Sequence, residues 1–280
     1  MTAAVAAPGV HSGHEEVSFP RVVHSEWIKF KSLRSTWISL AVALVAAIGL
    51  GILFSALRAS HIANQQARAG IGPGAVRLGI DPTLTSLRGI FLAQLAIGVL
   101  GVLMITGEYG TGMIRATLTA VPLRWPVLLA KALVYAVVTF VISTLASLVA
   151  FLGGQAALNS HHLGVALSSP GAARAVIGGG LYLTFVGLLA LGCGFAIRNT
   201  GGAIATLFGL ILVLPLLANA LPTSWQNAVN QYLPLNAGTS LISTVHHAHT
   251  LGALAGGLVF AGYAAAALVV GWVVLKRRDA

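Results

Sequence analysis

The sequence contains few charged residues. Only 8% of its 280 residues are Asp, Glu, Lys or Arg, and only six of these are acidic. Apolar residues make up 57% of the chain and the mean hydropathy is +0.89, whereas soluble domains contain about 45–50% apolar residues. This balance excludes an ordinary soluble domain and indicates an integral membrane protein.

The chain also lacks cysteine pairs and a recognisable leader. Its single cysteine, Cys193, cannot form a disulfide within one chain, and its position in an apolar run favours a buried, inert thiol. Residues 1–20 contain no apolar core preceded by positive charge, so we predict a disordered tail there rather than a signal peptide. Residues 276–280 are predicted to form a second short tail.

Motifs for catalysis and nucleotide binding are missing as well. The sequence has no G-x-x-x-x-G-K-[ST] phosphate loop, no G-x-S-x-G nucleophile motif and no H-E-x-x-H zinc motif. We therefore predict that the chain has no catalytic residues and that it binds no ATP and no other cofactor of its own.

Six apolar runs are each long enough to cross a bilayer, which requires about 20 helical residues. They lack the alternation of apolar and polar residues that a membrane barrel requires. We predict an all-α, polytopic membrane protein whose transmembrane domain occupies residues 37–275. The predicted spans are 37–57, 89–106, 127–152, 176–197, 202–221 and 251–275.

The acidic residues all lie outside these predicted spans. Ion-driven transporters usually keep ionisable residues within the membrane, so this distribution argues against a secondary transporter. Lys131 and Arg198 lie near span ends, where we expect their side chains to extend to the lipid headgroups. The six acidic residues are Glu15, Glu16, Glu26, Asp81, Glu108 and Asp279.

Histidines gather in two predicted outer loops, as His161 with His162 and as His246, His247 and His249. Histidine is a common metal ligand. Because no Cys, Asp or Glu lies close in sequence to either group, we predict surface histidines and no metal site.

Basic residues give the chain a formal net charge of +10. Most of them flank apolar runs, where Lys and Arg contact lipid headgroups, and no long basic run indicates nucleic-acid binding. With six spans both termini lie on one side, and the basic residues favour that side, so we predict that both termini are cytoplasmic. Eleven of the sixteen basic residues then lie inside: Arg21, Lys29, Lys31, Arg34, Arg115, Arg124, Lys131, Arg198, Lys276, Arg277 and Arg278.

Residues 21–36 are predicted to form an amphipathic helix that lies at the membrane interface. Val23, Trp27, Phe30, Leu33 and Trp37 recur at helical spacing, and Ser25, Lys29 and Ser32 face away from them. Trp and Lys suit an interfacial helix because the ring lies at headgroup depth and the ammonium binds anionic lipid. We expect this helix to contact a partner as well; a simple membrane anchor is the alternative.

A second cytoplasmic feature is the segment "GEYGTGMIRATLTAVPLRWP", residues 107–126, between the second and third spans. Thr111 is positioned to cap a short helix that has Met113, Ile114 and Leu118 on one side and that Pro122 ends. A simple connection between two spans could be much shorter. We therefore interpret the segment as a docking surface.

On the outer side, residues 222–250 contain no formally charged residue. Their apolar residues fall into two groups separated by Pro234 and Gly238, which predicts two short amphipathic helices that dip into the outer leaflet. An ordinary solvated loop is the alternative. The residues of this predicted re-entrant segment are Trp225, Val229, Tyr232, Leu241 and Val245.

These cytoplasmic segments resemble those of type-2 ABC transporter permeases, the membrane subunits of many bacterial exporters. Glu108, Gly112, Met113, Leu118, Thr119 and Pro122 match the cytoplasmic segment of that family, and "GEYGTGMIRATL" is most similar to its actinobacterial version. The stretch "SEWIKFKSLRSTW" is similar to the family's entry into the first span. Met113 departs from the pattern, because many members have Thr at this position.

The resemblance implies that two six-span subunits, by analogy two copies of one chain, form a pathway. Two copies of a separate cytoplasmic ATPase, which bind ATP and Mg²⁺, would power the export of a lipophilic or amphiphilic cargo such as a drug, antibiotic, peptide or lipid across the bacterial plasma membrane. The interfacial helix and the segment 107–126, which is a coupling helix in that family, would contact the ATPase, and Glu108 would pair there with a basic group. The residues implied in that contact are Glu108, Tyr109, Thr111, Gly112, Met113, Arg115 and Leu118, with Trp27, Lys29 and Lys31. A secondary transporter or channel, and a non-transporting anchor or sensor, are the alternatives.

Overall fold

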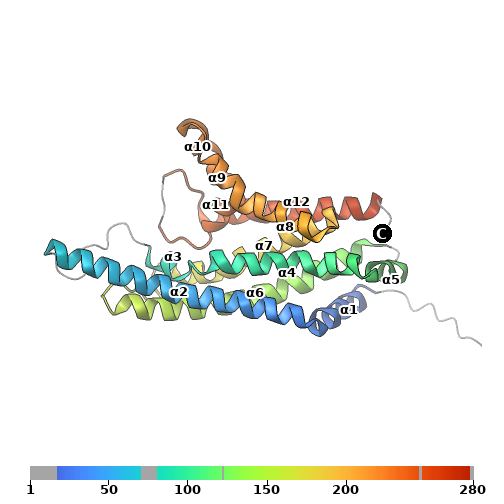
Figure 1. Ribbon diagram of the computed structural model, residues 1–280, viewed down its shortest axis with the longest axis horizontal. Helices are drawn as coiled ribbons and strands as arrows, with labels where there is room; N and C mark the ends of the chain where they lie inside the picture. Colours follow the sequence, from blue (N-terminus) through green and yellow to red (C-terminus); the bar gives the residue numbers. More distant parts are fainter. Residues whose placement is uncertain (1–17, 71–80, 122, 246–247, 278–280) are drawn as a thin grey trace, which may run out of the picture.

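The structure is a computed structural model that describes residues 18–70, 81–121, 123–245 and 248–277. These residues contain helices and no strands, and six of the helical segments are long and apolar enough to cross a membrane. The prediction of an all-α protein with six candidate spans is therefore confirmed. The spans are α2 (Arg34–Ala69), α4 (Ile90–Gly110), α6 (Trp125–Asn159), α7 (Ala172–Ile197), the continuous segment from α8 (Thr200–Phe208) through η1 (Gly209–Val213) to α9 (Leu214–Ala218), and α12 (Ala253–Arg277) (Figure 1).

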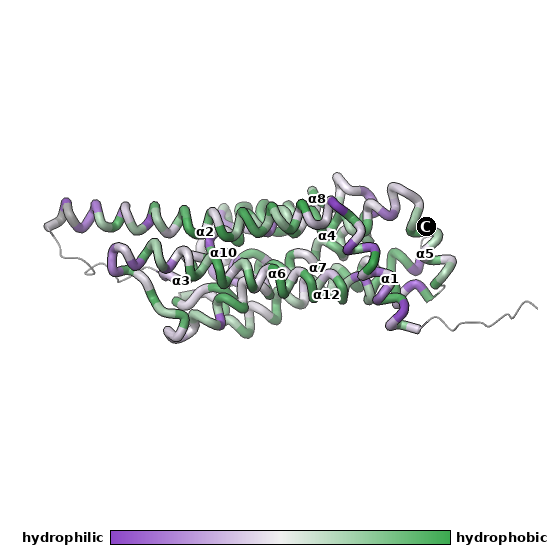
Figure 2. Tube along the Cα trace, turned by 90° about the horizontal axis from the view of Figure 1, so that it is seen from below, coloured by the Kyte–Doolittle hydropathy of each residue, from purple (hydrophilic) through white to green (hydrophobic). Residues whose placement is uncertain are grey.

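The helices α2 and α6 are longer than the sequence predicted. They contain 36 and 35 residues, or about 50 Å at 1.5 Å per residue, which exceeds the roughly 30 Å of a bilayer core. Beyond the predicted ends at 57 and 152 they are held together by a small second core of Ala59, Ile62, Leu158 and Leu163. The hydropathy of the chain falls toward these ends, as Figure 2 shows, because the outer turns are helical without being apolar.

The helix α7 lies at the centre of the bundle. It packs against α4, α6 and α12, and most of its residues are buried. Close packing depends on small residues, since a Cβ at Gly187 would collide with the ring of Tyr135. The Tyr135 hydroxyl donates a 2.7 Å hydrogen bond to the carbonyl oxygen of Ile97, so the polar atom of this buried ring is satisfied.

The fifth span leans away from the bundle. Its middle, η1, is a π-helical turn, and Pro215 follows two residues after its end; a π-bulge or a proline bends a helix. Figure 1 shows α9 projecting from the other spans together with α10 (Thr223–Val229). The helix ends at Ala218 rather than at the predicted residue 221.

The outer segment contains short helices, as predicted, but they group the residues differently. After α10 come η2 (Asn230–Tyr232) and α11 (Pro234–Thr239), and α11 packs against α12. Trp225, Val229 and Tyr232 are exposed, whereas Leu241 is buried in the turn after α11 and Val245 is partly exposed. The second apolar group therefore forms no helix of its own.

Two charged side chains hold this outer segment against the bundle. Arg174 donates to the carbonyl oxygens of Ser240, Leu241 and Ser243. Asp81 caps α3 (Pro82–Ser86) and also accepts a 2.7 Å hydrogen bond from the backbone N–H of Thr244. His246 and His247 lie outside the described residues, and among those described no group of three potential metal ligands occurs.

The first helix, α1 (Phe19–Ser32), begins before the predicted residue 21 and ends at an extended residue, Leu33, rather than at 36. The predicted tail 1–20 lies outside the described residues as far as residue 17. At the other terminus α12 continues to Arg277, and residues 278–280 also lie outside the described part. Figure 1 shows α1, α5 (Met113–Ala120) and the C-terminal end of α12 together at one end of the bundle.

Candidate functional site

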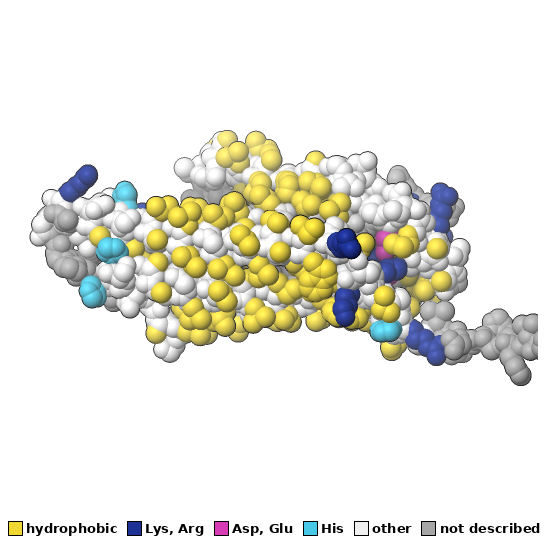
Figure 3. Space-filling model, turned by 60° about the horizontal axis from the view of Figure 1, so that its bottom comes forward, with side chains coloured by type: hydrophobic (Ala, Val, Ile, Leu, Met, Phe, Trp, Pro, Cys, Tyr) yellow, Lys and Arg dark blue, Asp and Glu magenta, His cyan; other side chains and the backbone are white. Residues whose placement is uncertain are grey.

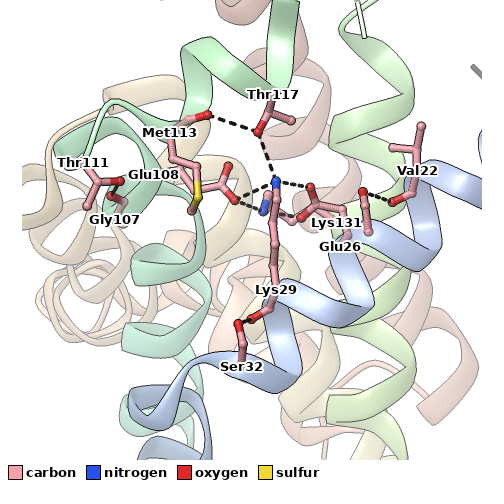
Figure 4. A network of polar contacts seen from close by, with 11 residues as sticks. Val22, Glu26, Lys29, Ser32, Gly107, Glu108, Thr111, Met113, Thr117 and Lys131 are labelled. Atoms are coloured by element: carbon pink, nitrogen blue, oxygen red, sulfur yellow. Dashed lines mark hydrogen bonds and ion pairs between the residues drawn. The ribbon is translucent and has the colours of Figure 1, made fainter. Parts of the chain in front are cut away.

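Four helices meet at the end of the bundle that carries α1 and α5, and they bring four charged side chains together there. Glu26 and Lys29 come from α1, Glu108 from the last turn of α4, and Lys131 from the second turn of α6. We call these four residues the charge cluster. Figure 4 shows that their side chains point toward one another.

The contacts alternate in sign. Lys131 Nζ lies 2.6 Å from Glu26 Oε2 and 2.8 Å from Glu108 Oε1. Lys29 Nζ lies 2.7 Å from Glu26 Oε1 and 3.3 Å from Glu108 Oε1, and it donates to the Thr117 hydroxyl of α5 at 3.1 Å. Each ammonium thus touches both carboxylates. The network joins α1, α4, α5 and α6, which are far apart in sequence.

The charge cluster is buried. The side chains of Glu26 and Lys131 are each 1% exposed and that of Glu108 is 6% exposed, while Lys29 retains 24%. Burying a charge costs several kcal/mol unless a partner of opposite sign and good hydrogen bonds compensate. Two ammoniums and two carboxylates neutralise each other here, so the four side chains are stable only as a set.

The environment of Lys29 changes its pKa. Burial lowers the pKa of Lys29, but the hydrogen bond that Lys29 donates to Glu26 and the negative charges of Glu26 and Glu108 outweigh burial and raise the pKa above the ordinary value of 10.5. Lys29 is therefore held in its charged form. One atom remains without a partner: Glu108 Oε2 is buried and accepts no hydrogen bond from the described part of the chain.

The position of Glu108 differs from the expectation that it meets a basic group of a partner protein. The reason is that α4 continues to Gly110, so Glu108 belongs to the span and faces α1 and α6. It also lies inside a candidate membrane span, contrary to the sequence prediction for all acidic residues. Lys131, expected to extend to the headgroups, is buried because it pairs with Glu108.

Arg198, which was also expected to extend to the headgroups, makes contacts within the protein. It caps α7 in a left-handed conformation, donates to the carbonyl oxygen of Val274 at 3.2 Å, and lies over the ring of Tyr109 at 5.1 Å from the centroid. Tyr109 is half-buried under this guanidinium. The two residues connect the end of α4 with the ends of α7 and α12.

Gly112 directly precedes the short helix α5, and its φ of 73° lies in the left-handed region that favours glycine. Thr111 does not cap the helix, because its hydroxyl instead donates to the carbonyl oxygen of Gly107. Ile114 and Leu118 are buried and anchor α5 to the bundle. The helix ends at Ala120, and Pro122 lies outside the described residues.

One face of α5 remains exposed. It carries Met113, which is 41% exposed, together with Arg115, so Met113 does not share one side of the helix with the buried Ile114 and Leu118 as the sequence predicted. The helix has only eight residues, and the two anchors at Ile114 and Leu118 fix which face turns inward. Thr111 and Gly112 lie exposed in the turn before it.

The buried face of α1 is also rotated from the predicted stripe. Val22, Glu26 and Phe30 are buried, whereas Trp27 is 41% exposed. Glu26 was not part of the predicted apolar stripe, and its burial is tolerated because Lys131 neutralises its carboxylate. Lys31 and Trp27 are left on the exposed side of α1.

Of the residues expected to contact a partner, six therefore lie exposed at one end of the bundle. Tyr109 is half-buried, Lys29 is held in the charge cluster, and Glu108 and Leu118 are buried. Glu26, Thr117 and Lys131 were not among the predicted site residues, although opposite charges near the ends of different apolar runs are a usable signal of such pairing. The six exposed residues are Trp27, Lys31, Thr111, Gly112, Met113 and Arg115.

Comparison with known proteins gives this site no name: neither the protein-family models nor the curated proteins contain a match to the chain.

Proposed function

We propose that this chain is the permease subunit of an ATP-driven exporter of the type-2 ABC class in a bacterial plasma membrane, with both termini in the cytoplasm. The observation that supports this most directly is α5. It is a separate eight-residue helix between two spans, anchored by Ile114 and Leu118, with its other face exposed. Such a helix suits a partner that pushes on the bundle from the cytoplasm.

The charge cluster gives that partner a mechanical connection to the spans. Lys29 of α1 contacts Thr117 of α5 and Glu108 of α4, and Lys131 ties both carboxylates to α6. A displacement of α5 or α1 would therefore move α4 and α6 with it, as a rigid-body transition. In this proposal the partner ATPase binds ATP and Mg²⁺, and the chain itself has no enzymatic activity.

The proposed contact with the ATPase consists of exposed residues from α1 and α5. Trp27 and Met113 supply apolar area, and Lys31 and Arg115 supply positive charge. Aromatic, Met and Arg side chains are the types enriched in the centres of protein interfaces. Glu108 holds the contact surface in place from inside the protein rather than touching the partner.

A second copy of the chain would complete the pathway. The segment from η1 to α9 leans away from the bundle and exposes large apolar side chains along both elements. A neighbouring subunit would cover these side chains. Its membrane-facing surface is apolar and fits a lipophilic or amphiphilic cargo. The exposed residues are Leu212, Val213, Leu214, Leu216 and Leu217.

The test is reconstitution with the ATPase encoded beside this chain. The chain alone is expected to bind no ATP, because it has no phosphate loop. Together in lipid, the two proteins should copurify, and a transported compound should stimulate ATP hydrolysis. Saturable ATP binding by the isolated chain, or failure of every neighbouring ATPase to assemble with it, contradicts the proposal.

One observation favours a second candidate function, an ion-coupled transporter. Glu108 is an ionisable residue buried in a span, and its Oε2 is unpaired within the described residues. The two functions differ in their energy source. Export from ATPase-free vesicles that is driven by a proton gradient and abolished by an uncoupler would favour this second function.

A further inference from the structure

A groove between α6 and α12 lies apart from the charge cluster. It has a volume of about 290 Å³ and is lined by Leu128 and Leu129 of α6 and by Leu268 and Val269 of α12, with Trp125 and Trp272 at its sides. All six lining side chains are apolar or aromatic. Figure 3 shows hydrophobic side chains over the middle of the molecule, with Lys and Arg placed toward its ends.

Basic side chains stand at one end of this groove. The ammonium of Lys276 lies 5.8 Å from the centroid of the Trp272 ring. Arg124 directly precedes Trp125, and its Nη1 donates a 2.8 Å hydrogen bond to the carbonyl oxygen of Leu275. This bond joins the start of α6 to the end of α12, so both cations lie where the groove opens at the end of the bundle.

The tryptophans of the groove are residues typical of a membrane interface. Tryptophan prefers the boundary between hydrocarbon and headgroups, and two of the five tryptophans line this groove. Trp125 also stacks on Phe19 of α1 at 6.3 Å between ring centroids. An acyl chain in the groove would therefore place its headgroup beside Lys276 and Arg124.

We propose that this groove is a binding site for an anionic phospholipid of the leaflet that faces α1 and α5. The acyl chain packs against the leucines and tryptophans, and the phosphate group is bound by Lys276, while Arg124 holds the start of α6 to the end of α12 through the Leu275 carbonyl oxygen. The proposal requires only that the chain spans a membrane; it does not depend on the ABC exporter function.

Charge argues for lipid over a second copy of this chain. The chain carries a net charge of +10, and at this end its described carboxylates, Glu26 and Glu108, are buried and already paired. Two such surfaces would repel each other across the groove. A phosphate headgroup supplies a negative charge for Lys276, and one basic residue near an anionic surface contributes about five-fold in affinity.

The first test is native mass spectrometry of the full chain with phosphatidylglycerol or phosphatidylcholine that share the same acyl chains. The wild type should retain phosphatidylglycerol about five-fold better, from the contribution expected of one cation. Lys276→Gln should remove this preference, and Lys31→Gln, a matched change at the same end of the bundle, should leave it intact. Equal retention of both lipids by the wild type, or an equal loss in both variants, overturns the proposal.

The second test locates the acyl chain by quenching tryptophan fluorescence with phosphatidylglycerol that has brominated chains. A saturable part of the quenching should disappear in the Trp125→Phe/Trp272→Phe variant and persist in Trp225→Phe, because Trp225 lies on α10 in the uncharged outer segment. Soluble glycerol phosphate should not compete, since it has no acyl chain. Competition by glycerol phosphate, or quenching that depends equally on Trp225, contradicts a lipid site in this groove.

Discussion

At the scale of single residues, Lys131 is the central charge of the site. Its Nζ contacts both carboxylates of the charge cluster, at 2.6 and 2.8 Å, and its side chain is 1% exposed. Glu26 and Glu108 are buried beside it. Because the pairing neutralises the buried carboxylates, the effect of any change here depends on which charges it leaves behind.

Replacing Lys131 by Met is expected to destabilise the protein strongly. Two buried carboxylates would face Lys29 alone, and removing one partner of a buried ion pair typically costs about 3–5 kcal/mol. Thermal unfolding of the purified chain in detergent measures the effect, with Lys31→Met on the exposed side of α1 as the control. A Lys131→Met variant as stable as that control would show that the cluster contributes nothing to folding.

The raised pKa of Lys29 predicts a loss of stability at high pH. A folded-state pKa above the unfolded value near 10.5 means that the charged form stabilises the protein below that pH, and that the contribution disappears as the pH rises through the folded pKa. The wild type should therefore lose stability above about pH 10.5 more steeply than Lys29→Gln does. Unfolding midpoints measured from pH 8 to 12 on both proteins test this, and parallel curves would refute it.

Residue pairing is the part of the site that the sequence could not predict. Glu26 and Lys131 are separated by 105 positions in the sequence. Each is a charged residue, and the sequence around either one does not show that the other lies beside it. Only the packing of α1 on α6 brings them together and makes burial tolerable. The pairing of Glu26 with Lys131 also explains why the buried face of α1 differs from the predicted one: Glu26 rather than Trp27 faces the bundle.

At the scale of elements, the turn between α4 and α5 sets the direction of α5. Gly112 has a φ of 73°, and no atom lies within 4 Å of the place where a Cβ would be. A side chain there meets no steric obstacle but does meet backbone strain, which costs about 1–2 kcal/mol.

Gly112→Ala should therefore destabilise the protein or loosen α5 by roughly that amount, about 1–2 kcal/mol. Gly110→Ala provides a matched control, because Gly110 lies two residues earlier with no positive φ and equally open surroundings. Thermal unfolding and hydrogen exchange of residues 113–120 provide the measurement. Equal behaviour of the two variants would mean that the left-handed turn does not constrain α5.

Element existence was predictable, whereas element length was not. Apolar composition identified all six spans because about 20 apolar residues in a row have few other uses. Composition could not locate the ends of α2 and α6, since the turns beyond residues 57 and 152 are stabilised by the small second core of Ala59, Ile62, Leu158 and Leu163. The second outer helix was misplaced because Leu241 is buried by packing rather than by amphipathic helix formation.

At the scale of the whole molecule, six spans place the two ends of the described chain at the same end of the bundle, beside α5. The excess of basic residues at this end predicts that it faces the cytoplasm. Single cysteines at Ser18 and Arg277 in a Cys193→Ala background should be protected from an impermeant thiol reagent in whole cells. A cysteine at Thr223 on α10 should be labelled. The opposite pattern would reverse the topology and remove α5 from the reach of a cytoplasmic ATPase.

The central claim is that a partner ATPase drives the bundle through the exposed face of α5. The most direct measurement uses the reconstituted complex with the variant Arg115→Glu and records copurification and transport-stimulated ATP hydrolysis. The control is Arg58→Glu, which lies on α2 toward the end of the bundle away from α5. Both arginines are exposed, so neither change should alter the stability of the isolated chain. We expect that Arg115→Glu weakens assembly and reduces stimulated hydrolysis while Arg58→Glu retains both. Full assembly and full stimulation with Arg115→Glu would contradict it.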